Sequence, residues 1–516
     1  MPIPVLSPEQ SSTWDRAAEA AGIGLATLME SAGRAVASAI CTRYGDRVQQ
    51  GVIVATGIGN NGGDGWVTAR VLHQAGIPVW VAPLHGVGSE LERKMAALAH
   101  AAGVRQVGPD GPWPNAGLLV DALLGTGARG APREPVAALV VRLLDLRLPL
   151  VAIDGPTGLD LATGVSYLPT RADLSITFGG PRRGHLLARD EIGALLVADI
   201  GHPAPSPEWP SLVTDRLAAE WLPRLRAGDH KGSRGRVVVI GGTAGMTGAI
   251  RITSRAAFAA GAGLVHAVAP AESIAALIIA EPDLQTLSHE LQLPISSELD
   301  ALLQRADAVV IGPGLGRAAG TAELVLEVLA RVRSAVVDAD ALTVLQGHVK
   351  DLRALGAGRS LVLTPHTGEF HTLFPERAHS LEADPWSAAS VAADSAGVTV
   401  LLKGVPTVVA RSGRSVHTIA AGNPGLATGG SGDLLSGLIG AALARGLEPE
   451  ITAALGAQIL GRAADLAARR SSARTLRPMD VISALPDLWR AWDVTRIAPP
   501  LARPPFLLEL EQPQTY

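Results

Sequence analysis

The 516-residue chain has one cysteine, Cys41, and only 3% of its residues are aromatic. A single cysteine excludes an internal disulfide and any metal site made of several cysteines. Helix-forming residues surround Cys41, so we expect a small buried apolar side chain rather than a nucleophile. With so few aromatic residues, the cores must be built mainly from Ala, Val, Leu and Ile.

Segments that would insert the chain into a membrane are also lacking. The amino terminus has no basic region followed by an apolar stretch, so it is unlike a secretory signal. No uncharged apolar run reaches the roughly 18 residues that span a bilayer. The formal net charge of −4 offers no basic footprint for a nucleic acid. We therefore expect a cytoplasmic protein without membrane or nucleic-acid partners.

What the chain does contain is an alternation of short β-branched runs with helical stretches rich in Ala, Leu and Arg. This alternation is typical of βαβ units and mostly parallel sheets. The predicted strands are Val52–Thr56, Val79–Ala82, Leu118–Asp121, Leu150–Asp154, Leu174–Phe178, Leu195–Ile200, Arg236–Ile240, Leu264–Val268, Ala308–Ile311, Ala335–Asp338, Leu361–Thr364 and Thr399–Lys403. The four prolines of Gly201–Pro210 indicate a boundary. We predict an α/β domain over residues 1–210, a linker over 211–227, a second α/β domain over 228–490 and a loose tail over 491–516.

Three glycine-containing loops follow strands of the first domain: Gly57–Gly65 (GIGNNGGDG), Asp121–Gly127 (DALLGTG) and Asp154–Gly158 (DGPTG). Ligands of open α/β sheets bind beyond the carboxyl ends of the strands. The first loop opens a helix, where backbone N–H groups and the helix dipole favour a phosphate. Asp121 and Asp154 are candidates for an acid/base or for ligands of a hard cation. Either Asp alone would more commonly cap a turn.

The string GIGNNG also matches the G-x-G-x-x-G pattern of dinucleotide-binding dehydrogenases. That pattern needs an acidic residue about 20 positions later, at the end of the second strand. Val79–Leu84 (VWVAPL) offers none. We therefore predict that the loop holds phosphates in another manner, the alternative being a tight strand-to-helix turn.

Together, the three loops resemble the amino-terminal domain of NAD(P)H-hydrate epimerases, which is Rossmann-like and interconverts the R and S forms of hydrated NADH and NADPH. The resemblance covers roughly residues 1–210. It implies that Asp154 is the acid/base and that Asn61, Asp121 and Thr157 hold a potassium ion; the family usually has Ser at the position of Thr157. The residues expected to contact the hydrated nucleotide are Asn60, Asn61, Gly62, Gly63, Asp64, Gly125, Thr126, Gly127, Ala128, Arg129, Gly130, Ala131 and Asp154.

Five motifs mark the second domain: GPGLG at Gly312–Gly316, DADAL at Asp338–Leu342, TPHTGE at Thr364–Glu369, KGVPT at Lys403–Thr407 and GNPGLATGGSGD at Gly422–Asp433. In the last motif, Gly429, Gly430 and Gly432 would present N–H groups at a helix N-terminus, forming an anion hole for a transferred phosphoryl group. Asp433 is placed to accept a proton from an attacking hydroxyl, the alternative being a helix cap. No Walker A string is present.

These motifs resemble the ribokinase-like NAD(P)H-hydrate dehydratases over about residues 225–490. The resemblance implies that His366 and Asp433 bind the hydrated nucleotide and that Ala262 and Gly316 line the same cleft. The adenine nucleotide would be bound by Lys403, Gly404, Val405, Pro406, Thr407 and Gly432. Two departures are visible, Met246 in place of a common aromatic and Thr343 in place of the usual Asn.

The two resemblances together imply a bifunctional repair enzyme, both isomerase and lyase, that acts on NADHX and NADPHX. Hydroxide is a poor leaving group, and phosphorylation would make it a good one. ADP would supply the phosphoryl group, with Mg²⁺ assisting, and AMP and phosphate would be released. A homo-oligomer is expected. Two alternatives stay open: a kinase of the same superfamily that phosphorylates a small alcohol, and a first domain that binds nucleotides without catalysis.

Overall fold

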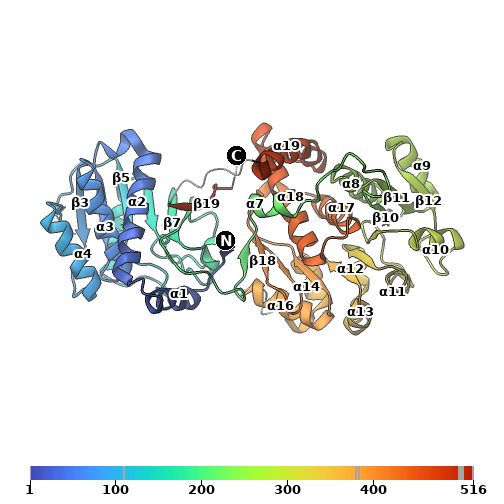
Figure 1. Cartoon of the computed structure of the whole chain (residues 1–516), viewed down its shortest axis with the longest axis horizontal. Helices are drawn as coiled ribbons and strands as arrows, with labels where there is room; N and C mark the ends of the chain where they lie inside the picture. The colour runs from blue at the N-terminus through green and yellow to red at the C-terminus, as the bar shows by residue number, and fades with distance from the viewer. Residues whose placement is uncertain (1, 109–110, 378–380, 382–383, 498–504, 514–516) are drawn as a thin grey trace. The chain divides into compact units, whose positions relative to one another are not determined.

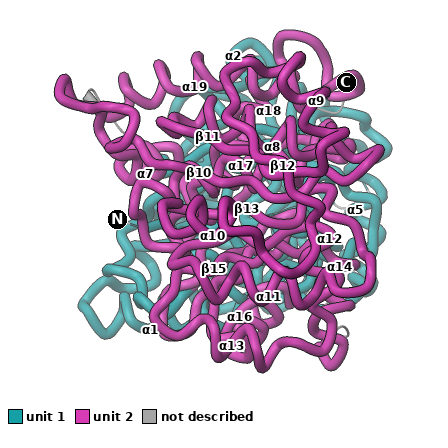
Figure 2. The backbone as a smooth tube through the Cα atoms, turned by 90° about the vertical axis from the view of Figure 1, so that its right-hand side faces the viewer, with its two compact units in different colours: residues 1–209, 501–513 teal, residues 210–500, 514–516 magenta. Residues whose placement is uncertain are grey.

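The computed structural model describes residues 2–108, 111–377, 381, 384–497 and 505–513. The chain divides into two units, Met1–Trp209 with Leu501–Pro513, and Pro210–Pro500 with Gln514–Tyr516 (Figure 2). In each unit helices lie along a mostly parallel sheet (Figure 1). The predicted α/β fold class is confirmed.

The sheet of the first unit has the strand order β19-β8-β7-β6-β5-β2-β3-β4. Neighbouring strands are parallel except β19, which runs antiparallel to β8. The strands are β2 (Val52–Thr56), β3 (Val79–Pro83), β4 (Arg105–Gln106), β5 (Leu118–Ala122), β6 (Leu150–Ile153), β7 (Leu174–Phe178), β8 (Ala194–Ala198) and β19 (Phe506–Leu510). The short strand β1 (Ile3–Pro4) precedes the helices α1 (Pro8–Ala20), α2 (Leu25–Val48), α3 (Asn60–Gln74), α4 (Glu90–Ala101), α5 (Val136–Asp145) and α6 (Arg183–Leu187).

Side chains of this sheet alternate between its two faces, as the pleat of a strand requires. Val52 and Val54 of β2 belong to the apolar cluster under α2 and α3. Ile53 and Ala55 belong to a separate cluster that includes α5. The unit therefore has three layers, and strands covered on both faces need the near-continuous apolar runs that the sequence shows.

The sheet of the second unit runs β9-β18-β17-β16-β15-β14-β13-β10-β11-β12. Its strands are parallel except that β17 is antiparallel to both β16 and β18. They are β9 (Ser211–Leu212), β10 (Arg236–Ile240), β11 (Leu264–Ala269), β12 (Gln285–Ser288), β13 (Ala308–Ile311), β14 (Ser334–Val337), β15 (Ser360–Leu363), β16 (Thr399–Leu402), β17 (Thr407–Ala410) and β18 (His417–Ile419).

One face of this sheet is covered by helices α8 (Thr247–Ala259), α17 (Ser431–Ala444) and α18 (Pro449–Arg470), which share one apolar core with α19 (Pro478–Ile497) and α7 (Asp215–Trp221). The remaining helices are α9 (Ala271–Ala280), α10 (Ser297–Leu303), α11 (Thr321–Arg331), α12 (Asp340–Val344), α13 (Val349–Gly356), α14 (Thr367–Leu373) and α16 (Pro385–Ala396). Short 3₁₀ turns are η1 (Pro375–Arg377), η2 (Pro424–Leu426) and η3 (Ala473–Thr475). In both units the predicted strands are present, with ends shifted by one or two residues at most.

Two segments differ from the predictions. The expected linker 211–227 contains β9 and α7, and the Thr214 side chain caps α7 by accepting the Leu217 N–H at 3.2 Å. The expected loose tail contains the end of α19 and also β19, which covers the edge of β8. Part of that tail, residues 498–504 and 514–516, lies outside the described residues. Neither strand was predicted, because each is too short or too close to prolines to show the apolar–polar alternation of a strand.

Cys41 is exposed on α2, contrary to the expectation that it is buried. Partial burial nevertheless raises the pKa of its thiol, which favours the unreactive protonated form. No helix in the described part of the chain is long and apolar enough to cross a membrane.

The pairing of β19 with β8 predicts that Leu510 stabilises the first unit. Leu510 is 7% exposed, whereas Leu507 of the same strand is 44% exposed. Leu510→Ala should lower the free energy of unfolding by about 2 kcal/mol, and so lower the first unit's thermal midpoint by roughly 4–8 °C. Leu507→Ala is the matched control and should change it little. Equal effects of the two substitutions in calorimetry would contradict the strand assignment.

Candidate active sites

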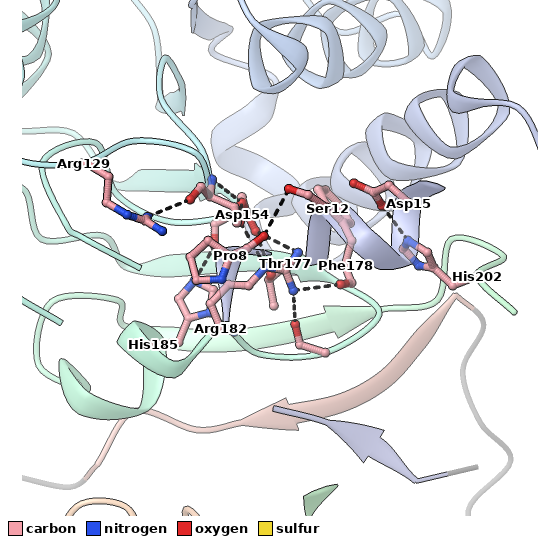
Figure 3. A network of polar contacts seen from close by, with 12 residues as sticks. Pro8, Ser12, Asp15, Arg129, Asp154, Thr177, Phe178, Arg182, His185 and His202 are labelled. Atoms are coloured by element: carbon pink, nitrogen blue, oxygen red, sulfur yellow. Dashed lines mark hydrogen bonds and ion pairs between the residues drawn. The ribbon is translucent and has the colours of Figure 1, made fainter. Parts of the chain in front are cut away.

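Asp154 lies directly after β6, at the carboxyl edge of the first unit's sheet. Its φ of 65° turns the backbone sharply, a conformation that Asp adopts more readily than most residues. One carboxylate oxygen, Oδ2, accepts the Thr126 N–H at 2.8 Å and also the Thr126 hydroxyl. The other, Oδ1, accepts the Thr177 hydroxyl at 2.8 Å (Figure 3). The structure therefore brings Asp154 and the predicted 125–131 loop together.

Arg182 is the cation that accompanies this buried carboxylate. Its Nη2 lies 3.7 Å from Asp154 Oδ1, and its Nε donates to the Thr126 hydroxyl at 3.0 Å. Burial alone would raise the pKa of Asp154, but the charge of Arg182 and the hydroxyl donors hold it below its usual value. Asp154 is therefore ionised and able to act as a base.

His185 fixes the backbone of the same corner. Its Nδ1 accepts the Arg182 N–H at 2.9 Å, and its Nε2 donates to the Asp154 carbonyl oxygen at 2.6 Å. Burial lowers the pKa of His185 to about 4, so the ring is neutral, as this pattern of one acceptor and one donor requires. Sequence reasoning missed Arg182 and His185 because PRRGH carries no motif that distinguishes it from a surface turn.

Two of the three predicted cation ligands, Asp121 and Thr157, are in contact. Asp121 Oδ1 accepts the Thr157 hydroxyl at 2.8 Å, and its Oδ2 accepts the Thr157 N–H at 2.7 Å. Asn61 lies next to Gly125, where an added Cβ would be 3.3 Å from its Oδ1. Its Nδ2 is buried with no hydrogen-bond partner in the described part of the chain. Burial raises the pKa of Asp121, and a cation would offset that cost, so the paired oxygens of Asp121 and Thr157 fit a hard cation.

A cavity of about 840 Å³ lies in front of Asp154. Its wall includes most of the predicted nucleotide contacts, namely Asn60, Asn61, Asp64, Gly125, Thr126, Gly127, Ala128, Arg129, Gly130, Ala131 and Asp154. Gly62 and Gly63 are instead buried inside α3, where a Cβ would meet the Gly57 carbonyl oxygen at 1.9 Å and the Met29 sulfur at 2.5 Å. These two glycines are therefore required for packing.

Two further side chains of the cavity wall were not predicted. Asp15, on α1, accepts from His202 Nε2 at 2.9 Å. The ring of His202 stacks on Trp14 with centroids 4.3 Å apart, which holds the pair in place. The sequence offered no sign of this contact, because 187 residues separate the two partners.

The second unit has its own group of charged side chains at the carboxyl edge of its sheet. Asp338 follows β14 and is buried. Its Oδ1 accepts from Lys403 Nζ at 2.8 Å and its Oδ2 from the Ser436 hydroxyl at 2.6 Å. Lys403 also lies 3.5 Å from Glu369. Burial opposes the charge of Asp338, but Lys403 holds the pKa of that carboxyl below its usual value.

Asp433 lies in the first turn of α17, three residues before Ser436. Burial first, and then the negative charge of Asp338, raise its pKa to about 6. No hydrogen bond or ion pair to its carboxyl occurs among the residues that the structure describes. A carboxylate with this pKa is a better proton acceptor than an ordinary one.

The glycine string before Asp433 leaves open space at the start of α17. Gly430 has a φ of 93°, and a Cβ at Gly429 would meet nothing within 4 Å. The loop is held from behind by Asp465, whose carboxylate accepts the Gly422 N–H at 3.3 Å and the Asn423 amide at 3.1 Å. The predicted helix N-terminus is present at Ser431 without a side-chain cap from Gly430, and the Ser431 N–H donates to the Thr428 carbonyl oxygen at 3.4 Å.

The other predicted residues fall into two groups. Gly316 lies near the charged side chains around Asp433. Its N–H donates at 3.0 Å to Asp340, which is two residues after Asp338. His366 is exposed at the start of α14, where its ring accepts the Gly368 N–H at 2.9 Å.

Ala262 is not brought to this edge. It is 5% exposed and lies in the core just before β11. Because it precedes its strand, whereas the other residues follow theirs, it lies at the amino edge of the parallel sheet. The expectation that Ala262 lines the cleft with Gly316 therefore finds no support in this topology.

The KGVPT segment is only partly available to a nucleotide. Gly404 and Val405 are exposed, Pro406 is buried, and Thr407 begins β17. The ammonium group of Lys403 faces Asp338 and Glu369. Of the two departures noted in the sequence, Met246 is exposed before α8 and Thr343 bonds back to the Ala339 carbonyl oxygen at 3.5 Å.

No cluster of three or more His, Cys, Asp or Glu side chains that could hold a metal occurs among the described residues. Near Asp433, the Asp338 carboxylate already accepts hydrogen bonds from Lys403 and Ser436, and the Asp340 carboxylate pairs with Arg317 at 2.7 Å. These carboxylates do not form a ready-made Mg²⁺ site.

Comparison with known proteins agrees with this division. A family model described as YjeF-related protein N-terminus matches residues 25–184, and one described as NAD(P)H-hydrate dehydratase matches residues 237–487. The bifunctional NAD(P)H-hydrate repair enzyme of Moorella thermoacetica is 36% identical over 90% of this chain and 92% of its own. The bifunctional NAD(P)H-hydrate repair enzyme of Escherichia coli is 37% identical over 91% of this chain and 90% of its own. A solved ADP/ATP-dependent NAD(P)H-hydrate dehydratase from Bacillus subtilis, 24% identical, covers 54% of this chain and 97% of its own with a TM-score of 0.46.

The position of Arg182 predicts that removing its charge leaves the buried Asp154 carboxylate without a cation. Arg182→Met should lower the free energy of unfolding of the first unit by about 3 kcal/mol. Arg171→Met is the matched control, because Arg171 is 71% exposed beside Glu191, and it should cost less than about 0.5 kcal/mol. Urea-induced unfolding measures both, and equal stabilities of the two variants would show that Arg182 does not stabilise Asp154.

Proposed function

The chain belongs to the family of bifunctional NAD(P)H-hydrate repair enzymes, and we propose that its first unit interconverts the R and S forms of NADHX and NADPHX while its second unit dehydrates the S form. The observation that carries the assignment of roles is the position of two carboxyls: Asp154 is buried beside Arg182 in the first unit, and Asp433 lies in the first turn of α17 in the second.

The substrate determines the chemistry of the second unit. Water adds to a dihydronicotinamide ring at a carbon next to the ring nitrogen, so the hydroxyl to be removed shares its carbon with that nitrogen. In the proposed reaction, Asp433 accepts the hydroxyl proton while the oxygen attacks the terminal phosphorus of ADP. The P–O bond to AMP breaks, and the N–H groups at the start of α17 stabilise the charge of the transferred group.

The second step releases phosphate. The nitrogen lone pair forms a C=N bond as the C–O bond to phosphate breaks, and loss of a proton from the neighbouring carbon restores the dihydropyridine. The products are NAD(P)H, AMP and phosphate, so atoms and charge balance without an oxidant. Because the site is chiral, it would accept one epimer, and the first unit supplies that epimer from the other.

Two ions belong to the proposal. Potassium would be held by Asn61, Asp121 and Thr157, whose oxygens fit it, and would stabilise the loops around Asp154. Mg²⁺ fits no preformed carboxylate site near Asp433, so we assign it to the phosphates of the nucleotide. A cytoplasmic location and a homo-oligomer stay predictions, which fractionation and analytical ultracentrifugation would test.

The assignment of roles predicts that the two activities separate by mutation. Asp433→Asn should lower ADP-dependent recovery of NADH absorbance by about 10²–10⁴-fold, the usual contribution of a general base, while R/S exchange continues. Asp154→Asn should lower the exchange by a similar factor and spare dehydration of the S form. In each variant the unaffected activity is the internal control. A variant that loses both activities, or that loses neither, would contradict the assignment of one activity to each unit.

The pKa of Asp433 predicts the pH dependence of dehydration. A base must be ionised, and the pKa is raised to about 6. The rate with saturating ADP should therefore be constant above about pH 7 and fall tenfold per unit below about pH 6. A flat profile between pH 5 and 7 would exclude Asp433 as the base.

Incubation of mixed hydrates with ADP or ATP tests the whole proposal, including the phosphoryl donor. One AMP and one phosphate should appear for each NADH restored from ADP. A stable phosphorylated product without free phosphate would favour the alternative, a small-molecule kinase.

A further inference from the structure

We infer that Asp64 is the proton donor of the epimerisation and works together with Asp154 as base. This inference rests on the proposed epimerase function and adds a second acid/base group to it.

Asp64 faces the reaction space. It lies in the second turn of α3 and lines the same 840 Å³ cavity as Asp154. Its main-chain oxygen accepts the Thr68 hydroxyl at 2.8 Å. Its carboxyl, in contrast, makes no hydrogen bond or ion pair with any residue in the described part of the chain. A half-buried carboxyl on a cavity wall without a protein partner is available to a substrate.

The surroundings of the two carboxyls are opposite. Asp154 has the guanidinium of Arg182 and two hydroxyl donors. Asp64 has no cation; burial first, and then the charges of Asp154 and Asp15, raise its pKa well above the usual value. Asp15 is fixed on the wall by its 2.9 Å contact with His202 (Figure 3). The environments therefore push the pKa values of the two carboxyls in the same cavity apart, the arrangement that assigns a base and an acid.

This pair suits a carbon that carries both a hydroxyl and the ring nitrogen. Asp154 takes the hydroxyl proton, the C–O bond becomes C=O, and the C–N bond breaks as Asp64 gives its proton to the nitrogen. The open-chain aldehyde rotates about its C–C bond. The reverse steps then close the ring on the other face and return both protons. No oxidant or further reactant is needed, and each group begins in the protonation state that the structure favours.

The first test is Asp64→Asn, which keeps the shape of the side chain but cannot give up a proton in this way. R/S exchange, followed by NMR on separated epimers, should fall at least about 100-fold in kcat with KM changed less than about threefold. A residue that only binds substrate would instead raise KM. The matched control is Asp46→Asn, an exposed position on α2, which should retain wild-type exchange.

The second test is the pH profile, which remains informative if Asp64→Asn fails to fold. An acid must carry its proton, so wild-type exchange should decline as the pH rises through the raised pKa of Asp64. The charges that act on Asp64 are those of Asp154, after β6, and Asp15, on α1. Asp15→Asn removes one of them and should move the alkaline decline to lower pH.

Two results would overturn the inference: exchange within threefold of wild type in a folded Asp64→Asn variant, or an alkaline decline that Asp15→Asn does not move. Absence of exchange in the wild-type protein would be different, because it would contradict the proposed epimerase function itself.

Discussion

A charge buried at the end of a β-strand needs a partner, and this requirement explains both sites. Parallel sheets covered on both faces leave one place for polar groups, the carboxyl edge of their strands. In the first unit Arg182 accompanies Asp154, and in the second Lys403 accompanies Asp338. Each unit then has a second carboxyl, Asp64 or Asp433, without a cation of its own and near the first. Burial and like charge raise the pKa of that second carboxyl, and this difference within each pair creates an acid or base of useful strength.

The two units use this difference in acidity for different reactions. In the second, Asp433 lies at a helix N-terminus, and in the proposed reaction it activates an oxygen while N–H donors bind the transferred phosphoryl group. In the first, the pair lines one cavity, and in the proposed reaction the two carboxyls exchange protons with one ring without any group being transferred. A chain with both arrangements can accept either epimer of a damaged nucleotide.

Much of this could be predicted from the sequence. Runs such as VIVAT are apolar throughout because both faces of the strand are covered, and glycine loops that follow them mark the carboxyl edge. Asp121 and Asp154 were therefore candidates from their places at strand ends, and Asp433 from its place after a glycine string, while their specific roles came from the family resemblance. Arg182, His185, Asp15 and His202 could not be, because their function depends on partners far along the chain. Nor does a glycine string tell which glycines face a ligand, and Gly62 and Gly63 prove to be needed for packing. The strands β9 and β19 are defined by pairing with distant strands and not by a pattern of their own.

The claim that two neighbouring carboxyls differ in acidity can be measured directly. Carbon-13 NMR of protein labelled at aspartate carboxyls follows each group through a pH titration, with Asn variants to assign the signals. The account predicts that the Asp433 signal titrates near pH 6, that the Asp64 signal titrates well above the ordinary aspartate value, and that those of Asp154 and Asp338 titrate below it. Four signals titrating together near the ordinary value would contradict it.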